Sequence, residues 1–329
     1  MQPGPGRGPG RPAVGIAFEG DFGTRLDALL AVAMLNGFQV KNEARQIALG
    51  VSKPQLGAAQ LADVVAGFYA SRPPGGANMV GMPEGALLKD AAPLATATLA
   101  EKTPEGKAKY TSGINRMLDT ADTAVLIRNQ LLAQNDGSAT IVVAGPATGM
   151  TRLMGLYGAL PQISAKVRQL VLASGAFGSS VIDPAIKADV AAARKVFAEW
   201  PTPIVVAGME VGEALPYPGA SIAADFEWSP AHPVVDAYRS ARPMPYDAPA
   251  PALAAMLHAV KGDENYFKLS APGTISVLDD GSLRFAPSDS GKHRYLIADP
   301  AEKERVVGAY TALVTAKPRP ARGGRGGPE

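Results

Sequence analysis

Acidic side chains gather in one short, glycine-bearing stretch near the start of the chain. Glu19, Asp21 and Asp27 lie between an apolar run typical of a buried strand and a helical apolar pattern. In an open α/β sheet, ligands bind at the carboxyl ends of strands, so this loop is where chemistry is expected. The acids suggest a cation or sugar site, and Arg25 is the unexpected residue among them.

Several chemistries place acids at the end of a strand, and the neighbouring residues separate them. A dinucleotide fold needs G-x-G-x-x-G here, whereas this loop offers only Gly20 and Gly23. A haloacid-dehalogenase-type phosphatase would need an aspartate nucleophile where Glu19 stands. A hard cation bound by carboxylates and a backbone carbonyl stays open. So does a structural interpretation, in which Asp27 caps the helix that it precedes.

The composition excludes several classes of function. The chain has 329 residues and 47% hydrophobic content, enough to bury a large core. Its net charge of +2 gives no strong field for nucleic acid or membrane. The absence of cysteine excludes disulfides, thiolate zinc sites and thiol nucleophiles, and three histidines argue against a multi-histidine metal site. No apolar run is long enough to predict a membrane span.

Both ends of the chain are low in complexity. Residues 1–12 and 317–329 are rich in proline, glycine and arginine and are predicted to be disordered tails around a single domain, 13–316. The arginine-glycine tail could touch RNA weakly, but a flexible solubilising role is favoured, and no nucleic acid is expected on the folded domain. A chain that starts in such a linker could be one whose signal peptide was removed. We therefore expect an exported or periplasmic location, with a cytoplasmic one as the alternative.

Apolar runs alternate with helical patterns along the chain. The runs are apolar on nearly every residue, as parallel strands covered on both faces should be, and lie at 13–18, 44–52, 139–145, 167–175 and 202–208. Helical patterns lie between or after them, at 27–36, 57–70, 119–134, 149–158 and 188–199. This alternation predicts an α/β fold with a mostly parallel sheet flanked by helices. Asp280-Gly281 between alternating apolar residues predicts a late β-hairpin over 274–285.

The order of these segments resembles the inosine–uridine-preferring nucleoside hydrolase family, particularly its distant bacterial branch. The segments that carry the resemblance are GDFGTRLDALLAVAML, IALGVSKPQ, IVVAGPATGMTRLM, LVLASGAFG, ADVAAARKVF, PIVVAGMEVGEALP and NYFKLSAPGTISVLDDGSLRF. The resemblance covers most of residues 13–315, and no single motif carries it. It implies a nucleoside hydrolase-like fold.

The resemblance also implies hydrolysis of a nucleoside N-glycosidic bond. In the family, aspartates and a backbone carbonyl hold a calcium ion that chelates the ribose hydroxyls and positions a water. An aspartate acts as general base, and nearby carboxylates stabilise an oxocarbenium-like transition state. The opening signature is D-x-D-x-G followed by D-D. Here Glu19 stands at the first acid, Asp21 at the second, which is the base and a metal ligand, and Asp27 at the penultimate one.

This chain departs from the family at the metal. Ala144 matches the carbonyl ligand, but Ala28 and Ala252 stand where two aspartate ligands belong. The sugar-contacting E-F-N triplet matches residues 183–185 (DPA), without the asparagine. Asp247, five residues before Ala252, could reach into the site instead. The resemblance thus implies Ca²⁺ as the cofactor while two of its ligands are missing.

Arg25 adds to this loss. A unit charge about 6 Å from a divalent ion would repel it by roughly 5 kcal/mol at an effective dielectric of about 20. If Arg25 points inward, we expect it to pair with Asp21 or Asp27 and to replace calcium as the counter-charge. If it points outward, it is an ordinary solvated loop residue.

Other polar and aromatic residues are weaker candidates. Glu210, after an apolar strand, faces either the pocket or a helix start. His293 is favoured as a structural hydrogen bonder near the hairpin, and His232 as a loop residue. Trp200 and Trp228 are too isolated to form a stacking platform for a base, so packing is the default.

Two functions from different classes stay open. The first is N-glycosidic hydrolysis of a ribonucleoside, with Asp21 as the base and Asp27 orienting the water or sugar; the other pocket candidates are Glu19, Arg25 and Glu210. The second is a degenerate relative that binds a ribosyl or sugar ligand, or a protein partner, without calcium-dependent turnover. A variant of the first keeps hydrolysis but uses no metal. The expected partner is a small nucleoside or sugar, and a homo-oligomer is allowed.

Overall fold

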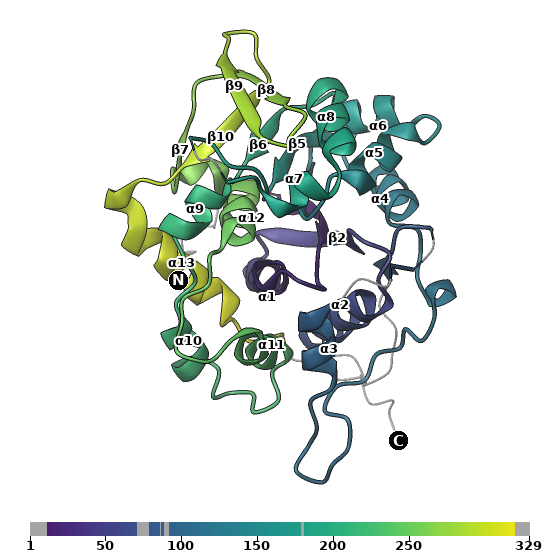
Figure 1. Ribbon diagram of the computed structural model, residues 1–329, viewed down its shortest axis with the longest axis vertical. Coiled ribbons are helices and arrows are strands. Elements are labelled where there is room, and N and C mark those ends of the chain that lie inside the picture. The colour runs from purple at the N-terminus through teal and green to yellow at the C-terminus, as the bar shows by residue number, and fades with distance from the viewer. Residues whose placement is uncertain (1–11, 71–78, 86, 89–91, 179–180, 320–329) are drawn as a thin grey trace, which may run out of the picture.

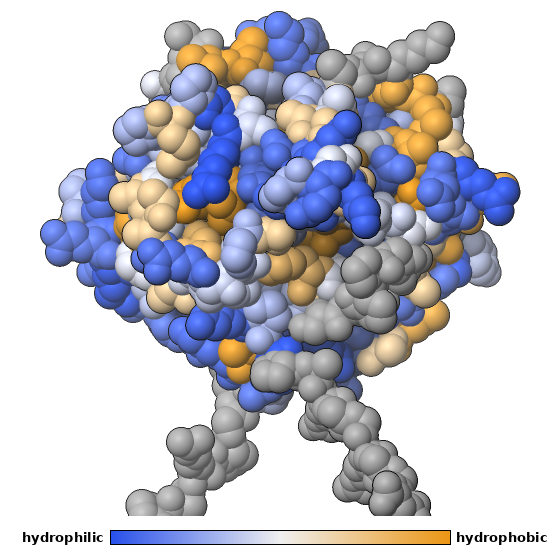
Figure 2. All heavy atoms as spheres, turned by 90° about the horizontal axis from the view of Figure 1, so that it is seen from below, coloured by the Kyte–Doolittle hydropathy of each residue, from blue (hydrophilic) through white to orange (hydrophobic). Residues whose placement is uncertain are grey.

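The computed structural model describes residues 12–70, 79–85, 87–88, 92–178 and 181–319 (Figure 1). Of the two tails expected from the sequence, residues 1–11 and 320–329 lie outside the described residues. Within the described part, no helix combines the length and the apolar character needed to cross a membrane. Figure 2 shows one face, on which hydrophilic residues are mixed with separate hydrophobic areas.

A ten-stranded sheet forms the centre of the described structure. In spatial order, its main path is β3 (Val80–Gly81), β2 (Ala44–Val51), β1 (Val14–Gly20), β4 (Ala139–Ala144), β5 (Val167–Leu172), β6 (Ile204–Val206), β10 (His293–Ile297), β8 (Gly273–Val277) and β9 (Leu283–Pro287). The remaining strand, β7 (Lys268–Leu269), pairs with β10.

The sheet is mostly parallel, as predicted. Every neighbouring pair from β3 to β10 along this path is parallel, and only β7, β8 and β9 run antiparallel to their neighbours or partners. The predicted late hairpin is confirmed as β8 and β9, joined through a turn that contains Gly281 at φ +90°. The five predicted strands are confirmed as β1, β2, β4, β5 and β6.

Helices cover both faces of this sheet. With α1 (Leu26–Val40) and α2 (Leu56–Tyr69), the helices are α3 (Pro93–Leu99), α4 (Thr123–Leu132), α5 (Thr148–Gly155), α6 (Ala159–Lys166), α7 (Pro184–Ala188), α8 (Val190–Glu199), α9 (Met209–Ala214), α10 (Gly219–Ala224), α11 (Pro233–Ala241), α12 (Pro251–Lys261) and α13 (Lys303–Val314). Short 3₁₀ turns lie at η1 (Met117–Asp119), η2 (Gly262–Glu264) and η3 (Pro300–Glu302). Alternation along β1 separates two cores: Ile16 and Phe18 face one, and Ala17 the other.

The predicted helices differ from the observed ones in their bounds, and two of these differences have a clear local cause. The helix expected from residue 119 begins at Thr123, because the side chain of Asp122 caps it by accepting the Val125 N–H at 2.9 Å. The helix expected over 149–158 ends at Gly155, and Gly158 then takes a left-handed conformation at φ +71°. In both cases a local capping or turn residue, which the apolar pattern does not reveal, determines where the helix begins or ends.

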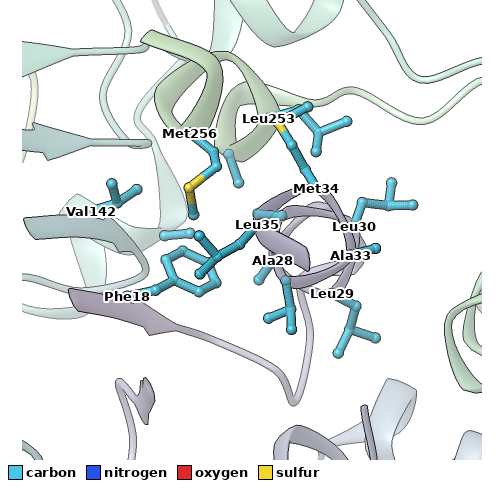
Figure 3. Close-up of a cluster of buried hydrophobic side chains, with 14 of the residues drawn as sticks. Phe18, Ala28, Leu29, Leu30, Ala33, Met34, Leu35, Val142, Leu253 and Met256 are labelled. Atoms are coloured by element: carbon cyan, nitrogen blue, oxygen red, sulfur yellow. The ribbon is translucent and has the colours of Figure 1, made fainter. Parts of the chain in front are cut away.

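The helix after the acidic loop, α1, is almost entirely buried. Seen nearly end-on in Figure 1, α1 lies at the centre of the molecule and contacts both α12 and α13. Its apolar residues run around the whole helix, which is typical of a buried helix. Figure 3 shows Leu35 between Phe18 of β1 and Met256 of α12. This packing fixes the start of α1, and with it the acidic loop, at the carboxyl edge of the sheet.

Candidate functional site

One pocket of about 360 Å³ opens at the carboxyl edge of the sheet. Its charged lining comes from loops and helices that follow four strands, β1, β2, β5 and β6. These side chains are Asp21, Arg25, Asp27, Lys53, Asp183 and Glu213. Its apolar walls include Pro146, Pro184, Met209, Pro249 and Pro251. The position agrees with the rule that ligands bind beyond the carboxyl ends of strands in α/β sheets.

Asp21 lies directly after β1, and both of its carboxylate oxygens have donor partners. Oδ2 accepts the Thr24 hydroxyl at 2.8 Å and pairs with Lys53 Nζ at 2.8 Å. Oδ1 accepts the Gly23 N–H at 3.2 Å. The Asp21 N–H donates to the Ala144 carbonyl at 2.9 Å, so β4 holds the loop in place.

Arg25 points inward and forms a bidentate ion pair with Asp27. Its Nε donates to Oδ1 at 3.0 Å, and Nη2 donates to Oδ2 at 2.6 Å. Nη1 donates to the Ala173 carbonyl at 2.6 Å, just beyond β5. Burial lowers the pKa of the Arg25 guanidinium, but the charge and hydrogen bonding of Asp27, together with the charges of Asp183 and Asp21, outweigh this effect, and the pKa is raised. Arg25 is therefore a fixed cation in the pocket lining.

Asp27 does not cap the helix that it begins. Arg25 is the residue before α1, and Asp27 lies in the first helical turn, where the helix dipole favours a negative charge. Its Oδ2 also accepts the Ala252 N–H at 2.9 Å, which ties α1 to the start of α12. The structural interpretation of Asp27 as a simple cap is therefore wrong, and the ion pair is the main role of its side chain.

The residues present do not fit the calcium site that the resemblance implies. Ala28 and Ala252 are both fully buried, and Figure 3 shows Ala28 within the hydrophobic cluster. Asp247 accepts the Gly219 N–H at 2.9 Å at the start of α10 and does not line the pocket. The Ala144 carbonyl already accepts the Asp21 N–H. Among the residues that the structure describes, no group of three or more histidine, aspartate or glutamate side chains could hold a metal ion.

Glu19 lies beneath the pocket and not in it. Its position in β1 has the same parity as Ala17, so its side chain enters the second core, against Gly149 of α5. Both carboxyl oxygens are buried, and within the described part of the chain neither has a hydrogen-bond partner. Burial, and to a smaller extent the charge of Asp122, raises the pKa of Glu19 to about 8. Glu19 is thus a buried acid that is mostly protonated at pH 7, and it does not line the pocket.

Two acids lie near the β5–β6 end of the pocket. Asp183 lines it and accepts the Ala185 N–H at 2.7 Å, capping α7. Glu210 does not line the pocket: its Oε2 accepts the Phe177 N–H at 3.4 Å, and Glu213 of the same helix is the pocket residue.

The histidines and tryptophans have structural roles. His293 Nδ1 accepts the Ile275 N–H at 2.9 Å beside the hairpin, as expected. His232 is not the simple loop residue that was expected, because it is buried. The centre of its ring lies 4.5 Å from that of Phe68, and its Nε2 lies 3.2 Å from the Tyr69 hydroxyl. Trp228 belongs to the same aromatic cluster, so packing is its role.

Lys53 and Glu213 line the pocket but do not emerge as candidates from the sequence. Lys53 follows the predicted strand at 44–52, and a charged residue at the carboxyl end of a buried parallel strand was the available signal. Lys53 reaches the pocket only because β2 lies next to β1, which brings the Lys53 ammonium to Asp21. That strand order is not contained in the spacing of residues along the chain.

No protein-family model and no curated protein matches the sequence, whereas solved structures match its fold. A plant nucleoside hydrolase, PpNRh1, superimposes with a TM-score of 0.66 at 19% identity, covering 93% of this chain and 100% of its own. The inosine–uridine preferring nucleoside hydrolase of Bacillus anthracis gives 0.64 at 16% identity, covering 92% and 99%. The type III effector protein XopQ, in complex with adenosine diphosphate ribose, gives 0.63 at 12% identity, covering 92% and 94%.

These likenesses define the class of the fold. The chain has the mixed α/β fold of nucleoside hydrolases, with a mostly parallel central sheet flanked by helices. The identities are low, so the likeness extends to the fold and not to the chemistry of each neighbour.

Proposed function

We propose that this protein binds a nucleoside or sugar ligand in the pocket at the carboxyl edge, without calcium and without calcium-dependent turnover. One observation carries this proposal: two fixed cations, Arg25 and Lys53, already neutralise the two acids, Asp27 and Asp21, that match the metal-binding signature. A nucleoside hydrolase-like scaffold therefore keeps its pocket but has exchanged a divalent ion for side-chain cations.

The energetics of these contacts favour side-chain cations over calcium. Ca²⁺ takes six to eight oxygen ligands, of which aspartates normally supply the charged ones. Each of the two acids here already accepts three hydrogen bonds or ion-pair contacts. Those of Asp21 come from Gly23, Thr24 and Lys53, and those of Asp27 come from Arg25, which contributes two, and Ala252. Calcium would have to displace these donors and would then lie beside the Arg25 charge, which repels it.

The pocket retains features that suit a sugar or nucleoside. Arg25 and Lys53 each have N–H groups beyond those used in their ion pairs, and these can donate to ligand oxygens. Proline and methionine side chains provide apolar walls against which a ring can pack. One structural neighbour, XopQ, is described in complex with a ribose-containing ligand, adenosine diphosphate ribose. This supports a ribosyl ligand for the present pocket.

A binding assay and a turnover assay together test the proposal. Inosine, uridine and ribose are titrated calorimetrically into the protein in the presence of a chelator, and release of free base is followed by chromatography with calcium and with chelator. We expect binding of at least one of these ligands in chelator and no base release in either condition. Base release that calcium supports and chelator abolishes would contradict the proposal, as would a lack of binding by all three ligands. Base release that is unaffected by chelator would instead favour hydrolysis without metal.

A variant that lacks the Lys53 charge tests whether the ligand binds in this pocket. Lys53→Met removes a pocket cation on β2's side of the site while leaving the buried Arg25–Asp27 pair intact. We expect this variant to fold and to bind the ligand about tenfold more weakly, because a charge-assisted hydrogen bond is worth roughly 1.5–3 kcal/mol. Unchanged affinity would show that the ligand binds elsewhere.

A further inference from the structure

Charge is unevenly distributed along the pocket. Asp21 is paired with Lys53 and Asp27 with Arg25, so the half of the pocket next to β1 and β2 is balanced. Asp183 and Glu213 line the other half, and within the described ranges neither forms an ion pair with a lysine or arginine. The end of the pocket near β5 and β6 thus has carboxylates without partner cations.

A third acid lies close to these two, behind the pocket lining. Glu210 lies three residues before Glu213 on α9, and its buried Oε1 has no hydrogen-bond partner in the part of the chain that the structure describes. Burial raises the pKa of Glu210, and the charges of Glu213 and Asp183 raise it further. Burial also raises the pKa of Asp183, although the charge of Arg25 opposes this effect. The charges of Asp183 and Glu213 thus repel a charge on Glu210, and a cation placed beside Asp183 and Glu213 would relieve this repulsion.

A metal ion is not the cation that fits this end. Metal binding requires several oxygens converging to within about 2.0–2.6 Å of one point. Among the described residues no acidic group of three converges in this way, and these acids are no exception. An organic cation, in contrast, spreads its charge over a ring and is stabilised by carboxylates at larger distances. Met209 and Pro184 lie next to the acids in sequence and line the same pocket, so a flat ring has apolar walls there.

We propose that the ligand of this pocket is an N-glycoside of a positively charged base, with its cationic ring held near Asp183 and Glu213. The inference rests on the proposed function, because it places a glycosyl ligand in the same pocket. The sugar would lie towards Arg25 and Lys53, whose remaining N–H groups donate to its hydroxyl oxygens. Glu213 is exposed on the pocket rim and is the carboxylate that meets the incoming cation.

The test uses two ligands that differ in charge and little in shape. Nicotinamide riboside has a positively charged ring, and its 1,4-dihydro form is neutral; both are titrated calorimetrically into the full chain in chelator, with uridine alongside. We expect the cation to bind about tenfold more tightly than the neutral form, as one uncompensated charge in a partly screened pocket would give. The ratio should decrease as salt is raised, because exposed charges are screened.

Two variants keep the test independent of folding. Glu213→Gln removes the rim charge on an exposed side chain and should reduce the ratio to about threefold or less. Glu304→Gln removes an equally exposed charge on α13, outside the pocket, and should leave the ratio unchanged. Equal affinity for the charged and neutral forms, or a ratio insensitive to Glu213→Gln, would overturn this inference while leaving the proposed function standing. A failure of uridine and both ribosides to bind would count against the proposed function itself.

Discussion

Arg25 joins three segments of the chain through one planar group. It pairs with Asp27 in the first turn of α1 and donates to the Ala173 carbonyl beyond β5. Asp27 in turn accepts the Ala252 N–H at the start of α12. A calcium ion in a related site would hold acids together in the same way, so the guanidinium provides the cross-link as well as the charge.

Removing this guanidinium should destabilise the fold. Arg25→Ala leaves Asp27, whose side chain is 7% exposed, as an unpaired buried charge, and we expect a loss of roughly 3 kcal/mol in the free energy of unfolding. Arg25→Lys should recover only part of this, because an ammonium cannot reproduce bidentate pairing together with the contact to Ala173. Urea unfolding followed by circular dichroism measures both. A loss below about 0.5 kcal/mol for Arg25→Ala would place Arg25 among ordinary surface ion pairs.

Glu19 makes stability depend on pH. Its pKa is raised from 4.5 to about 8 in the folded chain, so the folded state holds a proton that the unfolded state releases. The resulting stability is fully present below pH 4.5 and is lost as pH rises towards 8, by up to about 1.4 kcal/mol per pH unit. The free energy of unfolding of Glu19→Gln, relative to that of the wild type, should therefore be higher at pH 8 than at pH 5.

Unfolding in guanidinium chloride at pH 5, 6.5 and 8 measures the free energy of unfolding and checks the Glu19 prediction. Glu199→Gln, at an exposed position on α8, is the matched control and should follow the wild-type pH dependence. If Glu19→Gln shows the same slope with pH as wild type, Glu19 does not hold a proton in the folded chain.

Among the ion pairs of the pocket, the one between residues close along the chain was easier to anticipate from the sequence than the one between distant residues. The pairing of Arg25 with Asp27, two residues apart, was one of the alternatives that the sequence offered, beside a pair with Asp21 and an outward position. The pairing of Lys53 with Asp21 was not, because it depends on β2 lying beside β1. Likewise, the pocket is lined by Glu213 and not by the predicted Glu210. The two residues lie about one turn apart on α9, and the sequence pattern does not specify which of them faces the pocket.

Among the secondary-structure elements, those with continuous apolar sequence were the easiest to predict. β1 and β4 are buried at every residue, and both were expected. β10, which pairs with β6 and continues the parallel sheet, was not expected, because its five residues are only partly buried and show no clear period. The hairpin of β8 and β9 was found because alternating residues flank its Asp-Gly turn.

The close approach of α5 to β1 gives a prediction about an element. A Cβ at Gly149 would lie 2.3 Å from a Glu19 carboxyl oxygen, whereas one at Gly155, in the same helix, would meet nothing within 4 Å. We expect Gly149→Ala to cost about 1–3 kcal/mol of unfolding free energy through overpacking. Gly155→Ala should be neutral or slightly stabilising. Thermal unfolding of the two variants measures the difference, and equal melting temperatures would mean that α5 can shift away from β1 freely.

The molecule combines a nucleoside hydrolase-like fold with ion pairs at the carboxyl edge of its sheet. Its fold is that of nucleoside hydrolases, while the residues at the carboxyl edge place ion pairs where the resemblance implies metal ligands. The fold class was predictable because it depends on the order of strands and helices. The pocket was predictable only in part, because it gathers residues from loops and helices that are far apart in sequence.

Titration of calcium into the protein by calorimetry tests whether Arg25 and Lys53 take the place of a calcium ion. The experiment uses the full chain after treatment with chelator, with and without saturating ligand from the binding assay above. The ion pairs at Asp21 and Asp27 predict no stoichiometric calcium binding in either condition. They also predict a melting temperature that calcium leaves unchanged, since only a ligand that binds the folded state can raise it. Tight binding of one calcium ion per chain, with a matching rise in melting temperature, would contradict this replacement.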